Sequence, residues 1–175
     1  MMNKQNNDNL KILEYKFIIE AIKSNPYLIE HIENQTEEIC LEAVRNNGNA
    51  LCYIKEPTHK IYLEALREDG LALRFIKQQT EELCLEAVRN EGLALQYVEN
   101  QTEEICLEAV RQEGFALQYV KDQTYDICLE AVRNNGFAID FVSDKYKTDK
   151  LCLLSKKQIE KKNKHDKLMS YYTLV

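Results

Sequence analysis

The chain repeats one block of 22 residues. All five glycines lie 22 residues apart, and a threonine, a glutamate and an arginine recur with the same spacing. A divergent copy precedes the full repeats from about residue 14, and a degraded copy with Thr148 in the threonine position follows them. A period of this length predicts a stack of supersecondary units. The five full repeats start at Thr36, Thr58, Thr80, Thr102 and Thr124.

Each block carries the features of two helices. In the block that starts at Thr102, the threonine is a good N-cap, and glutamates follow in the first turn, where the helix dipole favours negative charge. Apolar residues then recur with helical spacing over 105–110. We expect Gly114 to end this helix in the left-handed conformation, and 115–120 to form a second, shorter helix.

Neither helix is long enough to be stable alone in water, since isolated helices below roughly 12 to 15 residues are marginal. Apolar residues also cover more than one face of each helix, so neighbours must pack on both sides. The sequence therefore predicts an all-α fold, an α-solenoid of 22-residue helix–turn–helix repeats with one longer and one short helix each. Leucine-rich repeats have a comparable period, but they need a strand with alternating residues, and this pattern is absent here.

The whole chain, 1–175, is expected to form a single repeat domain. Residues 1–9 are polar and predicted to be disordered, 10–35 form an N-terminal capping repeat, 36–145 form the five tandem repeats, and 146–175 form a lysine-rich C-terminal cap and tail. Pro26 takes the glycine position and stops the first helix from continuing. In the C-terminal helix, Leu151, Cys152 and Leu154 are expected to face inward.

Charge is divided unevenly along the chain. The net charge is −6, and from Lys145 onward nine lysines outnumber three acids by six, so residues 1–144 carry −12. Nucleic-acid binding needs clustered Lys and Arg, and the acidic body argues against it. The sequence shows neither a membrane-spanning apolar run nor a secretory signal, which predicts a cytoplasmic protein without a membrane partner.

Four cysteines share one position of the repeat, which Tyr62 fills in the second copy. Equivalent residues of stacked helices lie roughly 8 to 10 Å apart, whereas a disulfide needs Cα atoms within about 7 Å and zinc needs four converging ligands. We therefore expect small apolar residues packed between helices. The cysteines in this position are Cys40, Cys84, Cys106 and Cys128.

The repeated Glu–Arg pairs and the repeated aromatic position are both expected to have structural roles. The Glu–Arg pairs three residues apart, such as Glu108 and Arg111, stabilise a helix surface and can also bridge neighbouring repeats. No nucleophile motif, phosphate-binding loop or metal-ligand spacing accompanies them, so we expect no enzyme, cofactor, metal or small-molecule substrate. The short helix has an aromatic position that we expect in the core, occupied by His31 in the divergent copy and then by Tyr53, Phe75, Tyr97, Tyr119 and Phe141.

The stretch EICLEAVRQEGFALQYVKDQT resembles the short helical repeats of unknown function that are abundant in giant viruses of amoebae, with relatives in some bacteria. The shared features are a Leu-Glu-Ala-Val stretch, a glycine about five residues later, and a short apolar-aromatic helix. The resemblance covers about 36–144 and is weak at the flanks. It implies a viral origin and an interaction role, and it supplies no catalytic residues.

Positions that vary between such similar copies are candidates for binding a partner. We call one set the short-helix row: Arg74, Gln96, Gln118 and Asp140, with Cys52 in the first full repeat. The second set is the helix-end row: Glu68, Asn90, Gln112 and Asn134, with Asn46 in the first full repeat. A third variable position holds Asn47, Asp69, Glu91, Glu113 and Asn135. Drift on a solvated face is the alternative explanation for each single residue.

These features predict a non-enzymatic scaffold or adaptor that binds a protein whose identity the sequence does not give. The alternative is a structural or self-assembling component, for example of a virus particle, that forms a homo-oligomer through its terminal repeats. Both functions need only exposed surfaces of a repeat stack.

Overall fold

A computed structural model describes the backbone of residues 2–172 and the side chains of residues 12–164. The chain divides into two compact units, residues 1–77 and 78–175, where the sequence predicts one domain. Such a division is typical of solenoids, because each repeat contacts mainly its neighbours in the chain.

The first unit contains three pairs of helices, each an α-helix followed by a six-residue 3-10 helix. They are α1 (Met2–Ser24) with η1 (Pro26–His31), α2 (Glu37–Asn46) with η2 (Gly48–Tyr53), and α3 (His59–Glu68) with η3 (Gly70–Phe75). The α-helices contact one another in chain order, and so do the 3-10 helices. The unit is therefore a stack with one layer of long helices and one of short helices.

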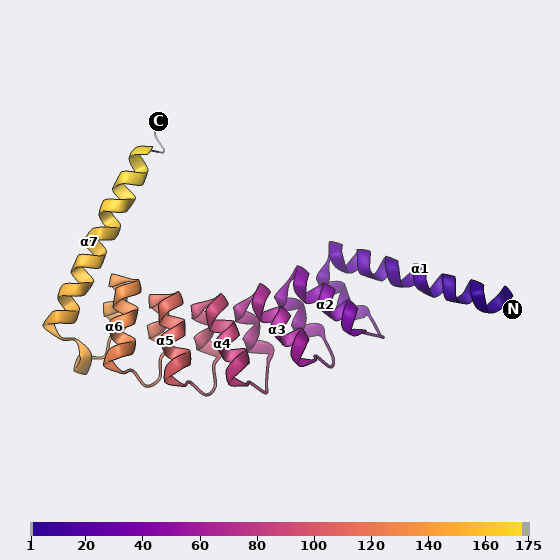
Figure 1. Cartoon of the computed structure of the whole chain (residues 1–175), viewed down its shortest axis with the longest axis horizontal. Helices are drawn as coiled ribbons and strands as arrows, with labels where there is room; N and C mark the ends of the chain where they lie inside the picture. The colour runs from indigo at the N-terminus through magenta and orange to yellow at the C-terminus, as the bar shows by residue number, and fades with distance from the viewer. Residues whose placement is uncertain (1, 173–175) are drawn as a thin grey trace. The chain divides into compact units, whose positions relative to one another are not determined.

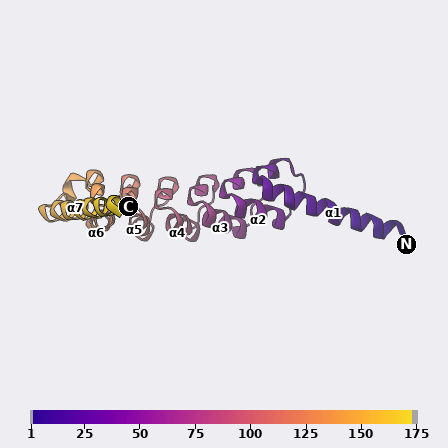
Figure 2. The same ribbon diagram turned by 90° about the horizontal axis from the view of Figure 1, so that it is seen from above.

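The second unit continues the pattern. Its pairs are α4 (Glu81–Asn90) with η4 (Gly92–Tyr97), α5 (Glu103–Gln112) with η5 (Gly114–Tyr119), and α6 (Tyr125–Asn134) with η6 (Gly136–Phe141), followed by η7 (Asp144–Tyr146) and α7 (Asp149–Tyr172). Figure 1 shows α4, α5 and α6 side by side in chain order. Seen from above in Figure 2, the short helices of this unit form a second row beside the long ones. Residues 2–172 contain no strand, and the helical repeat solenoid is confirmed.

The threonines begin the long helices as predicted. The Thr102 hydroxyl accepts a hydrogen bond from the Ile105 backbone N–H at 3.3 Å, and equivalent bonds form at the other repeats. The short helices, in contrast, are 3-10 rather than α-helical. Inside the repeat, the isoleucine or leucine, the alanine and the valine or leucine of the long helix are buried together with the alanine of the short one.

The glycines do not have the conformation that the sequence predicts. Among the described residues no glycine has a positive φ, because the preceding residue makes the turn in an extended conformation, as Glu113 does with φ −146°. Glycine is needed for close packing instead. A Cβ added at Gly114 would lie 2.6 Å from the Ala131 carbonyl oxygen, and one at Gly48 would lie 2.5 Å from that of Ala65.

A glutamine precedes the threonine in four of the five full repeats, and it ties neighbouring repeats together. The Gln101 side-chain amide donates to the Tyr119 carbonyl at 2.9 Å and accepts from the Lys121 backbone N–H at 3.0 Å. The Cys106 thiol also donates to the Gln101 Oε1. Equivalent bonds form at Gln35, Gln79 and Gln123. In the second repeat, where Pro57 replaces the glutamine, Tyr62 replaces the cysteine that would donate to it.

The glutamate–arginine pairs act both within and between repeats. Arg111 contacts Glu108 at 3.9 Å on the same helix, and Arg89 reaches Glu108 from the preceding repeat at 3.6 Å. In the first unit Arg45 hydrogen-bonds Glu64 and lowers the pKa of its carboxyl. These exposed pairs each contribute only a few tenths of a kcal/mol, about as much as other surface ion pairs.

The aromatic position of the short helix is not a core position. Tyr53 and Phe141 are 36% and 39% exposed, and Phe75, Tyr97 and Tyr119 are half-buried. His31 is also exposed. The alanine and leucine of the short helix point inward, whereas the aromatic ring packs along the surface, as Phe141 does at 6.0 Å from the Phe115 ring centroid.

The two terminal helices differ from the repeats. α1 begins at Met2, so it includes residues 2–9, where the sequence predicts disorder. Polar composition argues against burial, but a helix pairs its own backbone N–H and C=O groups, so a polar segment can also be helical. In α7, Leu151 is buried as predicted, while Cys152 and Leu154 are only half-buried. The side chains of the tail, residues 165–175, lie outside the described part.

Candidate interaction surface

The short-helix row lies at the surface of both units. Arg74, Gln96, Gln118 and Asp140 are all exposed. Gln96 and Gln118 each donate only to a carbonyl of their own short helix, at 3.1 and 3.0 Å, so their side chains hold no other repeat in place. Arg74 differs, because it hydrogen-bonds Asn49 at 2.6 Å and lies over the Phe75 ring. In the second unit the row therefore offers free surface.

The helix-end row is exposed too, but part of it has a structural role. Glu68, Asn90, Gln112 and Asn134 are exposed. Asn134, however, donates to the Arg111 carbonyl and accepts from the Gly114 backbone N–H, both at 2.7 Å. Asn46 likewise donates to the Ile22 carbonyl at the end of α1. Asn46 and Asn134 thus hold the end of the preceding long helix.

The third variable position is half-buried and caps the short helices. Asp69 accepts a hydrogen bond from the Leu71 backbone N–H at 2.9 Å, and Asn47 and Asn135 make equivalent bonds. Glu91 and Glu113 make no side-chain cap in this position. Capping favours Asn and Asp here, so this position is structural in three of the five repeats.

The four cysteines of the repeated position are buried and have no disulfide partner. Burial raises the pKa of the Cys106 and Cys128 thiols to about 11, and it also raises the pKa of Cys40 and Cys84. The protonated thiol is poorly nucleophilic and can donate a weak hydrogen bond. Burial between helices agrees with the sequence-based interpretation.

We expect thiol labelling of the native protein to separate these cysteines. The exposed Cys52 should react first with an aromatic disulfide reagent at pH 8, and Cys106 and Cys128 should react on the order of 100-fold more slowly, because their thiolate fraction and access are both small. Mass spectrometry of timed samples measures each site. Equal rates at Cys52 and Cys106 would show that the repeats open freely.

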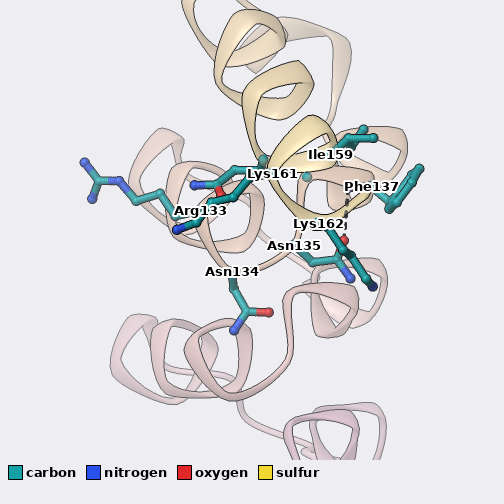
Figure 3. Close-up of a pocket in the computed structure, with 9 residues that line it drawn as sticks. Arg133, Asn134, Asn135, Phe137, Ile159, Lys161 and Lys162 are labelled. Carbon is teal, nitrogen blue, oxygen red and sulfur yellow. Dashed lines mark hydrogen bonds between the residues drawn. The ribbon is translucent and has the colours of Figure 1, made fainter. Parts of the chain in front are cut away.

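Surface cavities also occur outside the row. One of about 640 Å³ lies between α1 and α2 and is lined by Ile12, Tyr15, Ile19 and Glu38, among others. One of about 450 Å³ surrounds the Gln101–Thr102 loop. A third, of about 460 Å³, lies between α6, η6 and α7, and its lining residues include Arg133, Phe137, Ile159, Lys161 and Lys162 (Figure 3).

Among the described residues, no group of three or more His, Cys, Asp or Glu side chains is placed to hold a metal ion. Within the same part of the chain, none of the helices combines the length and the apolar composition that a bilayer crossing requires.

The fold and its exposed rows define a class, a tandem helical-repeat protein whose two layers stack repeat on repeat. The particular family follows from sequence comparison. The family described as "Domain of unknown function (DUF4116)" matches residues 15–57 and 80–124, and the chain belongs to it. The unmatched stretch between these segments, 58–79, is the repeat in which Tyr62 replaces the cysteine. Neither the curated proteins nor the solved structures yielded a match.

Proposed function

We propose that this protein is a non-enzymatic scaffold that binds a partner protein along the short-helix row. One observation carries the proposal. The residues that hold the stack together are repeated from copy to copy, whereas the exposed row changes from Gln96 and Gln118 to Asp140 while keeping its position. Solenoids bind partners with surfaces built from such positions.

The resemblance to repeats of giant viruses supports a viral source. A viral scaffold of this kind acts in the host cytoplasm or in the virus particle. Its partner is then a host or viral protein, and the acidic body argues against nucleic acid as the ligand.

Affinity capture with a row variant tests the proposal. Tagged wild-type protein and the double variant Gln96→Lys/Gln118→Lys are incubated with a lysate of amoebal cells, and bound proteins are quantified by mass spectrometry. We expect at least one protein whose recovery with the variant falls about tenfold, as for a disrupted interface centre. Both positions are exposed, so the substitutions should leave the fold intact.

The matched control adds the same charge elsewhere. Glu104→Gln/Asp126→Asn changes two exposed residues in the first turns of α5 and α6 and also raises the net charge by two. Recovery should match that of the wild type. If both variants lose the same proteins equally, the binding is electrostatic and not specific to the row, and the proposal fails.

Self-assembly is the second candidate function, and the exposed apolar side chains of α1 favour it. Phe17 is 74% exposed, and Ile12 and Leu13 are each 54% exposed. Ile12 also lines the cavity between α1 and α2. Apolar side chains gathered on one terminal helix are typical of an interface. Light scattering coupled to size exclusion should then show concentration-dependent mass that Phe17→Glu abolishes. A wild-type protein that stays monomeric at every concentration excludes this function.

A further inference from the structure

The short-helix layer of the second unit ends before the long-helix layer. η4 packs on η5 and η5 packs on η6, but among the described residues no short helix follows α7. By the register of the degraded repeat, Gln158 corresponds to Asn134, where α6 ends. α7 instead continues to Tyr172 and extends beyond α6 (Figure 1). In the described part of the chain, no further short helix therefore lies beside η6.

Aromatic rings pair between consecutive short helices, and the last short helix, η6, lacks such a pair on one side. In both units, the ring in the second position of one short helix meets the ring in the last position of the next, as Phe115 meets Phe141 at 6.0 Å and Tyr27 meets Tyr53 at 6.0 Å. Phe137 is the second residue of η6, and it has no following short helix to supply a ring. It is 40% exposed, whereas Phe115 is half-buried. An aromatic side chain from outside would complete the pattern.

The cavity next to Phe137 has a volume of about 460 Å³ and is positively charged. Lys161 and Lys162 of α7 both line it, with Lys161 extending toward Arg133 and Lys162 toward the side of Asn135 (Figure 3). Phe137 and Ile159 are its apolar lining residues. Arg133 also lines it, but Glu130 pairs with Arg133 at 2.5 Å and compensates that charge. No acidic residue is among the lining residues. The site therefore complements a ligand with both an aromatic group and negative charge.

We propose that this cavity binds a short acidic segment of a partner protein that carries one aromatic side chain. The aromatic ring packs against Phe137 as Phe141 packs against Phe115, and carboxylates lie near Lys161 and Lys162. The inference deepens the proposed protein-binding function and rests on it. It adds a second contact region at the end of the stack, separate from the residues Gln96 and Gln118.

Fluorescence polarisation of the full-length protein tests this site. The probe is a fluorescein-labelled octapeptide with three glutamates and one phenylalanine among glycines and serines. We expect saturable binding that weakens about tenfold with Lys161→Glu/Lys162→Glu and with Phe137→Ala. Binding should also weaken as salt rises from 50 to about 300 mM, because exposed charges are screened.

Matched controls separate the site from general charge effects. Lys156→Glu/Lys164→Glu changes the same charge at two exposed lysines of α7 outside the cavity and should leave binding unchanged. A peptide with alanine for phenylalanine should bind about tenfold more weakly. No saturable binding, equal loss in both lysine variants, or displacement of the peptide by millimolar inorganic phosphate with no dependence on its phenylalanine would each overturn the proposal.

The outcome is independent of the row experiment. If the row variant loses a captured protein while the octapeptide fails to bind, the scaffold function stands and only this cavity is wrong. If the peptide binds as expected but the row variant loses no protein, the binding region is the C-terminal end of the stack and not the row.

Discussion

Replacing Gly114 with alanine is expected to lower the free energy of unfolding by about 3 kcal/mol. The added Cβ would lie 2.6 Å from the Ala131 carbonyl oxygen and 2.9 Å from the Asn135 Cβ, so the backbones of two repeats must move apart. Separating them also weakens the bond from the Gly114 N–H to Asn134. Urea unfolding followed by circular dichroism measures the loss.

Whether Gly114→Ala lowers or raises the free energy of unfolding decides whether this glycine is needed for the close approach of two repeats. At a position with ordinary negative φ, alanine stabilises by about 0.4 to 1 kcal/mol because it restricts the unfolded chain. A neutral or stabilising Gly114→Ala would therefore contradict the close approach of the repeats. Gln112→Ala, an exposed change two residues earlier, should alter stability by less than about 0.5 kcal/mol.

Removing the Gln101 side chain is expected to cost about 2 kcal/mol, because it leaves backbone groups of the next loop without partners. The Gln101→Ala variant loses the bonds to the Tyr119 carbonyl and the Lys121 N–H, and the Cys106 thiol loses its acceptor. The site is only part-buried, so water restores some of these bonds and limits the loss. Urea unfolding again gives the difference.

A volume-matched variant separates hydrogen bonding from packing at this site. Gln101→Met keeps the length of the side chain and removes its amide, so we expect it to lose nearly as much stability as Gln101→Ala. A methionine variant as stable as the wild type would show that the amide bonds contribute nothing net.

Local chemistry made the helices predictable from the sequence. Threonine caps, acidic first turns and helical spacing of apolar residues act within one repeat, so the start of the α5 helix after Thr102 followed directly from the printed residues. The solenoid followed in turn, since helices this short must be buried between neighbours.

Contacts between repeats were harder to derive, because they depend on distances that a single block does not contain. The glycine position is one case: a glycine after a helix usually indicates a left-handed turn, but Gly114 is required by the approach of the Ala131 carbonyl from the next repeat. The glutamine is another. Its recurrence at Gln101 and Gln123 was visible, yet its partners lie in the following short helix.

The sequence predicted correctly that the candidate binding residues are exposed. It did not show which of them hydrogen-bond a neighbouring repeat. Variation between copies marked both rows, and all eight named residues are at the surface. The differences between copies could not show that Asn134 hydrogen-bonds the end of the preceding long helix. They also could not show that Gln118 hydrogen-bonds only within its own short helix. The C-terminal cavity was not foreseen, because it arises where α7 continues past the repeat pattern.

Site-specific photo-crosslinking tests the central claim, that the short-helix row is the surface that binds a partner, most directly. A benzophenone amino acid replaces Gln118 in one variant and the exposed Glu104 of the long helix in another, and each is irradiated in amoebal cells. We predict a discrete covalent adduct with one protein from position 118 and none from position 104. Adducts from position 104 alone, or the same adducts from both positions, would contradict the account.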